Sequence, residues 1–61
     1  MVVAEAMAAL PAAYREVIVL ADLLDFPVER TARQPGIGER AAKNRLHPAR
    51  RALAGLLGSR N

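Results

Sequence analysis

The stretch that decides the fold is residues 34–53, which read QPGIGERAAKNRLHPARRAL. Pro35 and Gly36 near its beginning favour a tight turn, because Gly36 can adopt the left-handed conformation that ends a helix. The residues that follow have the apolar spacing of a helix, which we expect over about residues 38–53. The sequence therefore predicts a turn near residues 34–38 that leads into a long helix.

The predicted helix has an apolar stripe and a polar stripe on opposite sides, when residues are placed at about 100° intervals. The apolar stripe is expected to pack on the rest of the protein. The opposite stripe offers cations, an amide and an imidazole, which are side chains that contact base edges and phosphates in a DNA major groove. The apolar stripe contains Ala42, Leu46, Ala49 and Leu53, and the polar stripe contains Arg40, Asn44, His47 and Arg51, with Lys43 beside them.

A short helix is expected just before the turn, over about Val28–Arg33. Gln34 should end it, because a residue before a proline avoids the helical region. Ala32 is small enough for two helices to cross closely. A short helix, a tight turn and a basic helix are typical of a helix-turn-helix motif. A helical hairpin with no role in DNA binding would show the same pattern.

Prolines divide the first half of the chain into two further predicted helices. Val2–Leu10 is rich in alanine, and Pro11 suits the first position of a second helix that should run to about Leu24. This second helix is apolar on more than one side, so it is either central to the fold or partly covered by another protein. Phe26 is expected to fill the core at the corner that follows. The helical period of the second helix is carried by Tyr14, Val17, Ile18, Ala21 and Leu24.

Composition sets the fold class and excludes several kinds of site. The chain has 61 residues, 52% of them apolar and 3% aromatic, which suits one small domain with an aliphatic core. No strand or hairpin pattern is present. We therefore predict an all-α domain of about four helices over residues 1–57, with a flexible tail at residues 58–61. The chain has no cysteine and one histidine, so we expect no disulfide, metal or cofactor site.

Charge is distributed unevenly along the chain. Residues 1–28 carry one arginine and four acidic residues, whereas residues 29–61 carry eight basic and two acidic residues. The basic half is what binding to a phosphate backbone requires, although a solvated charged surface would look the same.

Other function classes find no support in the sequence. No nucleophile, base and orienting acid come together, so we do not expect an enzyme or a small-molecule substrate. Val17–Ala21 is the longest strongly apolar run and is too short to span a membrane, and the first residues lack the basic region of a signal peptide. We therefore expect a cytoplasmic protein that does not bind membranes.

Three groups of residues, in order along the chain, carry a family resemblance. They are Leu10-Pro11 with Tyr14-Arg15-Glu16-Val17 and Leu20, then Phe26-Pro27, Glu29, Ala32 and Gly36-Ile37, and finally Lys43-Asn44-Arg45-Leu46-His47 with Ala49-Arg50-Arg51-Ala52-Leu53. Together they resemble region 4 of bacterial extracytoplasmic-function sigma factors, of the sigma-70 family, over about Glu5–Leu57. The resemblance implies a domain that recognises double-stranded promoter DNA at the −35 element. It also implies docking on the flap of the RNA polymerase β subunit during transcription initiation, with an anti-sigma factor as a further partner.

The resemblance also implies which side chains bind DNA. One group would face the bases or the adjacent phosphates, and a second group would mainly contact phosphates. The first group is Lys43, Asn44 and His47, and the second is Arg40, Arg50 and Arg51.

The chain departs from the family pattern at Thr31, Pro35, Ala42 and Pro48. The first three stand where larger aliphatic residues are usual, so the core of the motif should be smaller. Pro48 stands where arginine is usual, and it lacks the N–H that would bond to the Asn44 carbonyl. We therefore expect the last helix either to kink near Pro48 or to stop and restart there.

These departures leave an alternative function open. The chain would then be a protein-interaction module that binds the polymerase flap or an anti-sigma factor, with weak or lost DNA reading. The region that melts the −10 element is absent from the sequence. We therefore expect an excised domain, a fragment or a degenerate relative of a sigma factor.

Overall fold

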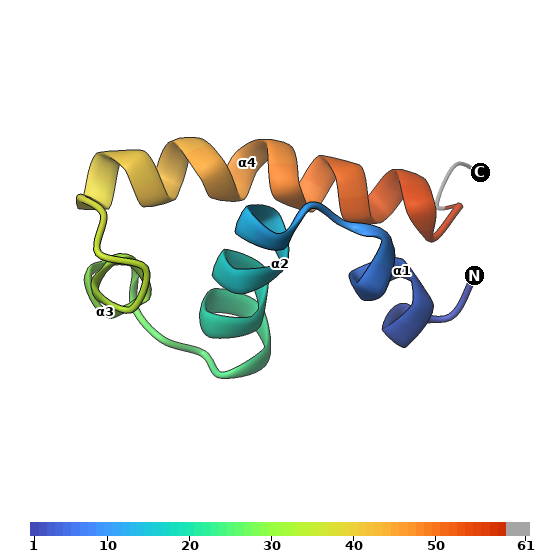
Figure 1. Ribbon diagram of the computed structural model, residues 1–61, viewed down its shortest axis with the longest axis horizontal. Helices are drawn as coiled ribbons and strands as arrows, with labels where there is room; N and C mark the ends of the chain where they lie inside the picture. The colour runs from blue at the N-terminus through green and yellow to red at the C-terminus, as the bar shows by residue number, and fades with distance from the viewer. Residues whose placement is uncertain (59–61) are drawn as a thin grey trace.

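The computed structural model describes residues 1–58, which form helices and short connections without a strand (Figure 1). The predicted all-α class is therefore confirmed. The predicted flexible tail lies, from residue 59 onward, outside the described residues. No helix in the described part of the chain has the length and apolar character needed to cross a membrane. The elements are α1 (Val3–Ala9), α2 (Ala12–Ile18), the π-helical segment η1 (Val19–Leu23), α3 (Val28–Arg33) and α4 (Glu39–Leu56).

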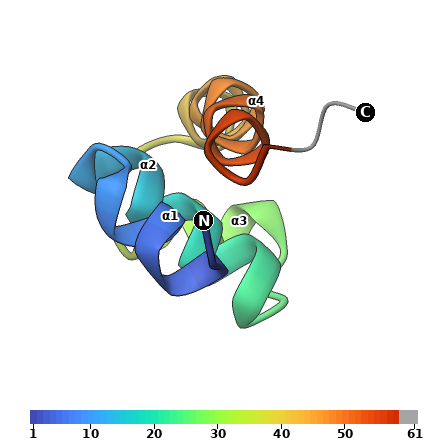
Figure 2. The ribbon, with the colours of Figure 1, turned by 90° about the vertical axis from the view of Figure 1, so that its right-hand side faces the viewer.

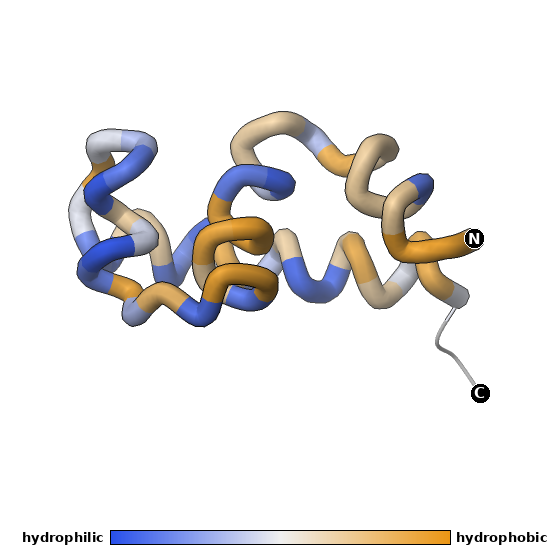
Figure 3. Tube along the Cα trace, turned by 90° about the horizontal axis from the view of Figure 1, so that it is seen from below, coloured by the Kyte–Doolittle hydropathy of each residue, from blue (hydrophilic) through white to orange (hydrophobic). Residues whose placement is uncertain are grey.

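The helix α4 lies along the long axis of the molecule, and α1, α2 and α3 pack against it (Figures 1 and 2). Hydrophilic residues gather toward the end that carries α3, and the most hydrophobic segments lie in the middle of the molecule and at its N-terminal end (Figure 3). The predicted apolar stripe of α4 faces this packing, since Ala42, Leu46 and Ala49 are buried and Leu53 is half-buried. The main core cluster consists of Met7, Leu10, Val17, Ile18, Leu46 and Ala49.

The second predicted helix does not keep a regular period to Leu24. It passes from α2 into η1, where the amide of Leu24 donates to the carbonyl of Val19 at 2.9 Å, as in a π-helix. The wider turn changes the register, so Leu20 is buried while Leu23 and Leu24 are 62% and 53% exposed. The regular helical period that was expected to include Leu24 therefore ends before this residue.

The helix α3 has the predicted bounds, and a Schellman motif ends it. The amide of Ile37 donates to the carbonyl of Ala32 at 3.0 Å, and that of Gly36 donates to Arg33 at 3.1 Å. Gly36 has the predicted positive φ, 74°. Gln34, however, keeps helical angles although a proline follows it, since these two bonds hold the last turn together. The expectation that Gln34 avoids the helical region is wrong.

The helix α4 runs without interruption through Pro48, so the predicted stop and restart at this residue is wrong. It also continues three residues beyond the predicted end at Leu53. Pro48 is half-buried, and Leu46 and Ala49 on either side of it are buried where α4 packs on α2. This packing on both sides of Pro48 offsets the loss of the hydrogen bond that proline removes.

Candidate nucleic-acid interface

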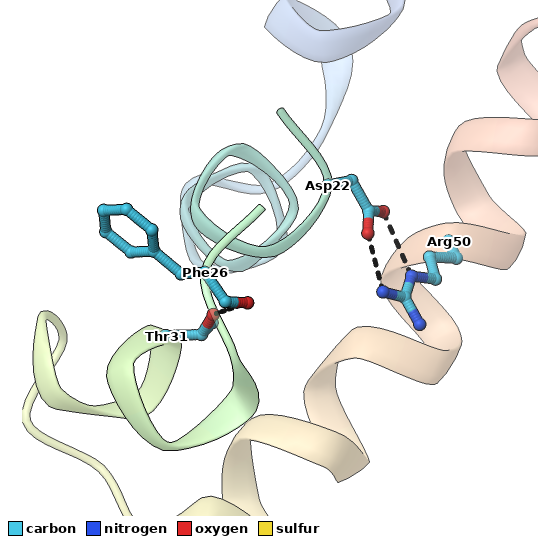
Figure 4. Close-up of polar contacts among 4 residues, drawn as sticks. All are labelled: Asp22, Phe26, Thr31 and Arg50. Carbon is cyan, nitrogen blue, oxygen red and sulfur yellow. Dashed lines mark hydrogen bonds and ion pairs between the residues drawn. The ribbon is translucent and has the colours of Figure 1, made fainter. Parts of the chain in front are cut away.

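The helices α3 and α4 and the turn between them form a helix-turn-helix whose core is built from small side chains. Ala32 is 2% exposed and Ala42 is fully buried where the two helices pack. Thr31 is also fully buried, and its hydroxyl donates to the carbonyl of Phe26 at 3.4 Å (Figure 4). At Ala42 the helices pack closely around the small side chain, and at Thr31 a hydrogen bond satisfies the buried hydroxyl. The smaller residues at these two positions therefore leave the core of the motif packed.

The outward face of α4 carries most of the predicted DNA-binding residues. These side chains are exposed, and they stand opposite the buried seam except for Lys43, which lies beside the others, as the helical spacing predicts. Among residues 1–58, none of them forms a hydrogen bond or ion pair with another side chain. Their cations, amide and imidazole are therefore available to a ligand. They are Arg40, Lys43, Asn44, His47 and Arg51.

Arg50, the sixth predicted residue, lies on the flank of α4 and is bound within the chain. Its Nε donates to Oδ2 of Asp22 at 3.0 Å and its Nη2 donates to Oδ1 at 2.6 Å, which makes a two-pronged ion pair (Figure 4). These hydrogen bonds raise the pKa of Arg50 above its ordinary value. Sequence reasoning did not identify this contact. The two residues are 28 positions apart, and no local pattern links them.

A shallow cleft of about 310 Å³ opens beside the outward face, where η1 and α3 approach α4. Lys43 gives it an unpaired positive charge and His47 an imidazole, while Arg50, which also lines it, is paired with Asp22. Arg30 adds a positive charge nearby, because its guanidinium lies over the ring of Phe26 at 4.1 Å from the centroid. A recess with this lining suits an anionic group such as a phosphate. The remaining lining is apolar and comes from Ala21, Phe26, Val28 and Leu46.

A small helix-turn-helix with an exposed basic and polar face on its second helix defines the class of DNA-binding helix-turn-helix domains. Comparison with known protein families identifies the family more closely: the family described as Sigma-70, region 4 matches residues 1–53. The chain belongs to this family, which serves transcription initiation through promoter DNA and RNA polymerase. Neither the curated proteins nor the solved structures gave a match.

Proposed function

We propose that this chain is the −35-reading, polymerase-docking region 4 of a sigma factor of the extracytoplasmic-function type. The observation that carries the proposal is the exposed face of α4, where Arg40, Lys43, Asn44, His47 and Arg51 stand together without partners in the described chain. A helix of this kind fits the major groove, and the basic half of the sequence supplies the electrostatic attraction to double-stranded DNA. The role is that of a binding domain without catalysis or cofactor.

The side chains on this face divide by their chemistry. Asn44 can form paired hydrogen bonds with an adenine edge, and Lys43 and His47 can donate to guanine or to an adjacent phosphate. Arg40 and Arg51 lie one and two turns away from Asn44 along the same stripe and suit phosphates at the groove edges. We assign base reading to Asn44 in the middle of the stripe, phosphate contact chiefly to Lys43 beside it, and positioning to the ends of the stripe.

Selection of duplexes from a randomised pool, followed by fluorescence anisotropy at two salt concentrations, tests this proposal. We expect enrichment of one short motif and an affinity that falls steeply as salt rises, because binding releases counterions from the phosphates. Salt-sensitive binding without any enriched motif would exclude base reading. The full 61-residue chain is used in these measurements.

Two neighbouring substitutions separate the proposed roles. Lys43→Ala should weaken binding to all duplexes and reduce the slope of log K against log salt by about 0.9. Asn44→Ala should leave this slope unchanged and relax the preference at one base pair. Arg33→Ala is the control, since it removes one positive charge from the end of α3, where Arg33 is ion-paired to Glu29 at 3.5 Å. An equal loss on Arg33→Ala would mean that charge alone controls binding.

An exposed apolar corner supports the second part of the proposal, which is protein contact. Leu23 and Leu24 are largely exposed at the end of η1. A shallow recess also lies between α2 and the end of α3, lined in part by Val19 and Leu20. These surfaces suit an apolar segment of the RNA polymerase β flap or of an anti-sigma factor, and they would serve that role even in a chain that reads DNA weakly.

Binding to purified polymerase core enzyme tests this contact. Leu23→Ser with Leu24→Ser should reduce the affinity about tenfold or more, because two exposed apolar side chains would no longer be buried in the complex. Ala13→Ser is the control at an exposed alanine of α2. Unchanged affinity in the leucine variant would assign polymerase binding to another surface.

A further inference from the structure

We infer that Asp22 and Arg50 are positioning residues for DNA recognition: their ion pair fixes α4 against η1, and Arg50 does not serve as a phosphate contact. The inference rests on the proposed function and deepens it. It separates Arg50 from the other five predicted DNA-binding residues, which remain on the outward face of α4. It also gives a role in recognition to an acidic residue that lies outside the helix-turn-helix.

The geometry of the pair is that of a structural clamp. Two nitrogens of one guanidinium meet two oxygens of one carboxylate, at 3.0 and 2.6 Å (Figure 4). This fork-to-fork arrangement fixes direction as well as distance, which a single ion contact does not do. The partners come from η1 and α4, so the clamp joins two elements that are far apart in sequence.

The two side chains of the clamp are exposed, 54% for Arg50 and 36% for Asp22, but the backbone that carries each of them is held by its surroundings. Asp22 lies in η1, where the amide of Phe26 donates to the carbonyl of Leu20 at 3.0 Å, and Leu20 is buried. Arg50 follows Ala49, which is fully buried in the main core. A change in the rotation or position of α4 would therefore break the two hydrogen bonds. The pair thus fixes the helix within the range that base contacts require.

The charges also disfavour Arg50 as a phosphate contact. A phosphate would have to displace the Asp22 carboxylate, which exchanges one anion for another at the same guanidinium. The released carboxylate would then stand near the DNA backbone and be repelled by it. Asp22 and Arg50 together carry no net charge, so the pair contributes little to counterion release. Lys43 and His47, which line the same cleft, have no such internal partner among residues 1–58.

The salt dependence of DNA binding tests the inference. The probes are the duplex that the wild-type chain enriches from a randomised pool and a scrambled duplex of the same composition. Lys43→Gln should lower the salt slope by about 0.9. Arg50→Gln removes the same charge, yet it should leave the slope unchanged and reduce discrimination between the two duplexes about tenfold, as expected when one base contact is misplaced. Asp22→Asn should reduce the discrimination by a similar factor without lowering the slope, because it breaks the same ion pair but leaves the charge of Arg50 in place.

Exchange of the two charged residues tests whether a restored ion pair also restores discrimination between the duplexes. The double variant Asp22→Arg with Arg50→Asp can restore the ion pair, so it should recover most of the discrimination that each single variant loses. Circular dichroism at the binding temperature confirms that each variant is folded. If Arg50 contacts phosphate instead, Arg50→Gln lowers the slope as much as Lys43→Gln does, and the exchanged variant binds worst. That result overturns the inference alone, whereas a wild-type chain that enriches no duplex overturns the proposed function and the inference together.

Discussion

Arg15 donates from its Nε to the carbonyl oxygen of Met7, eight residues earlier in the chain, at 3.0 Å. Its Nη2 also donates to the carbonyl of Leu10 at 3.0 Å. The guanidinium therefore holds the C-terminal end of α1, where carbonyl groups lack helical partners and where a positive charge is favourable. Arg15 is half-buried in the acidic half of the chain, and in the structure its role is to join α1 to α2.

Loss of this contact should destabilise the fold. Arg15→Met keeps an apolar stem but removes the donors, and we expect the free energy of unfolding to fall by about 1.5–3 kcal/mol, the range for hydrogen bonds to a charged group. Chemical denaturation measures this change. Arg33→Met is the control, since Arg33 forms only an exposed ion pair at 3.5 Å and its loss should cost less than about 1 kcal/mol. Equal effects of the two substitutions would contradict a special role for Arg15.

The two glycines Gly36 and Gly55 should respond in opposite ways to alanine. Gly36 has φ of 74°, so Gly36→Ala should cost about 1–2 kcal/mol from backbone strain. Gly55 lies inside α4, where alanine is the better helix former, so Gly55→Ala should stabilise by about 1 kcal/mol. A methyl group at either site would meet open space, so packing cannot explain the difference. Thermal unfolding measures both variants. If their unfolding midpoints shifted in the same direction, the result would contradict this account.

Pro48 should limit the stability of α4 although the helix is continuous. Pro48→Ala restores the amide that can bond to the Asn44 carbonyl, and we expect a gain of up to about 3 kcal/mol in the free energy of unfolding. Pro48→Arg should give a similar gain and also raise DNA affinity, with a salt slope steeper by about 0.9. Comparison of the two variants separates helix stability from charge. Unchanged stability in both would mean that the helix is unstrained at this position.

The close packing of α3 and α4 should not tolerate a larger residue at Ala32. This residue is 2% exposed, so Ala32→Leu has to push the two helices apart and should cost about 1–3 kcal/mol. It should also weaken DNA binding, because α4 would move relative to η1. Ala41→Leu is the control, since Ala41 is exposed on α4. Denaturant unfolding and anisotropy on the same preparations check both effects, and a fully stable Ala32→Leu variant would contradict the close packing.

Local signals explain what could be predicted from the sequence. Val28–Arg33 is bounded by Pro27 and by the Pro35-Gly36 turn, and its limits in the structure are the predicted ones. The buried seam of α4 follows from the helical period, because Ala42, Leu46 and Ala49 recur at the correct spacing. Such features depend on a few neighbouring residues, so a short stretch of sequence is enough to predict them.

Features that depend on distant or unusual geometry could not be predicted in this way. The π-helical winding of η1 has no signal in the order of apolar residues, and it takes Leu24 out of the regular helical period and leaves this residue exposed. The ion pair of Asp22 and Arg50 depends on how η1 and α4 meet in space. The continuity of α4 at Pro48 likewise depends on packing against α2, which outweighs the local preference of proline.

The length of α4 has a consequence for how the domain can evolve. The helices α1, α2 and α3 have seven, seven and six residues, too few to persist alone in water, and each packs on the 18-residue α4. The domain is therefore expected to fold as one cooperative unit around the helix whose outer side offers the polar face. A mutation that adapts this helix to a new target also acts on the scaffold that the other helices need. Recognition and foldability are thus selected together in the same eighteen residues.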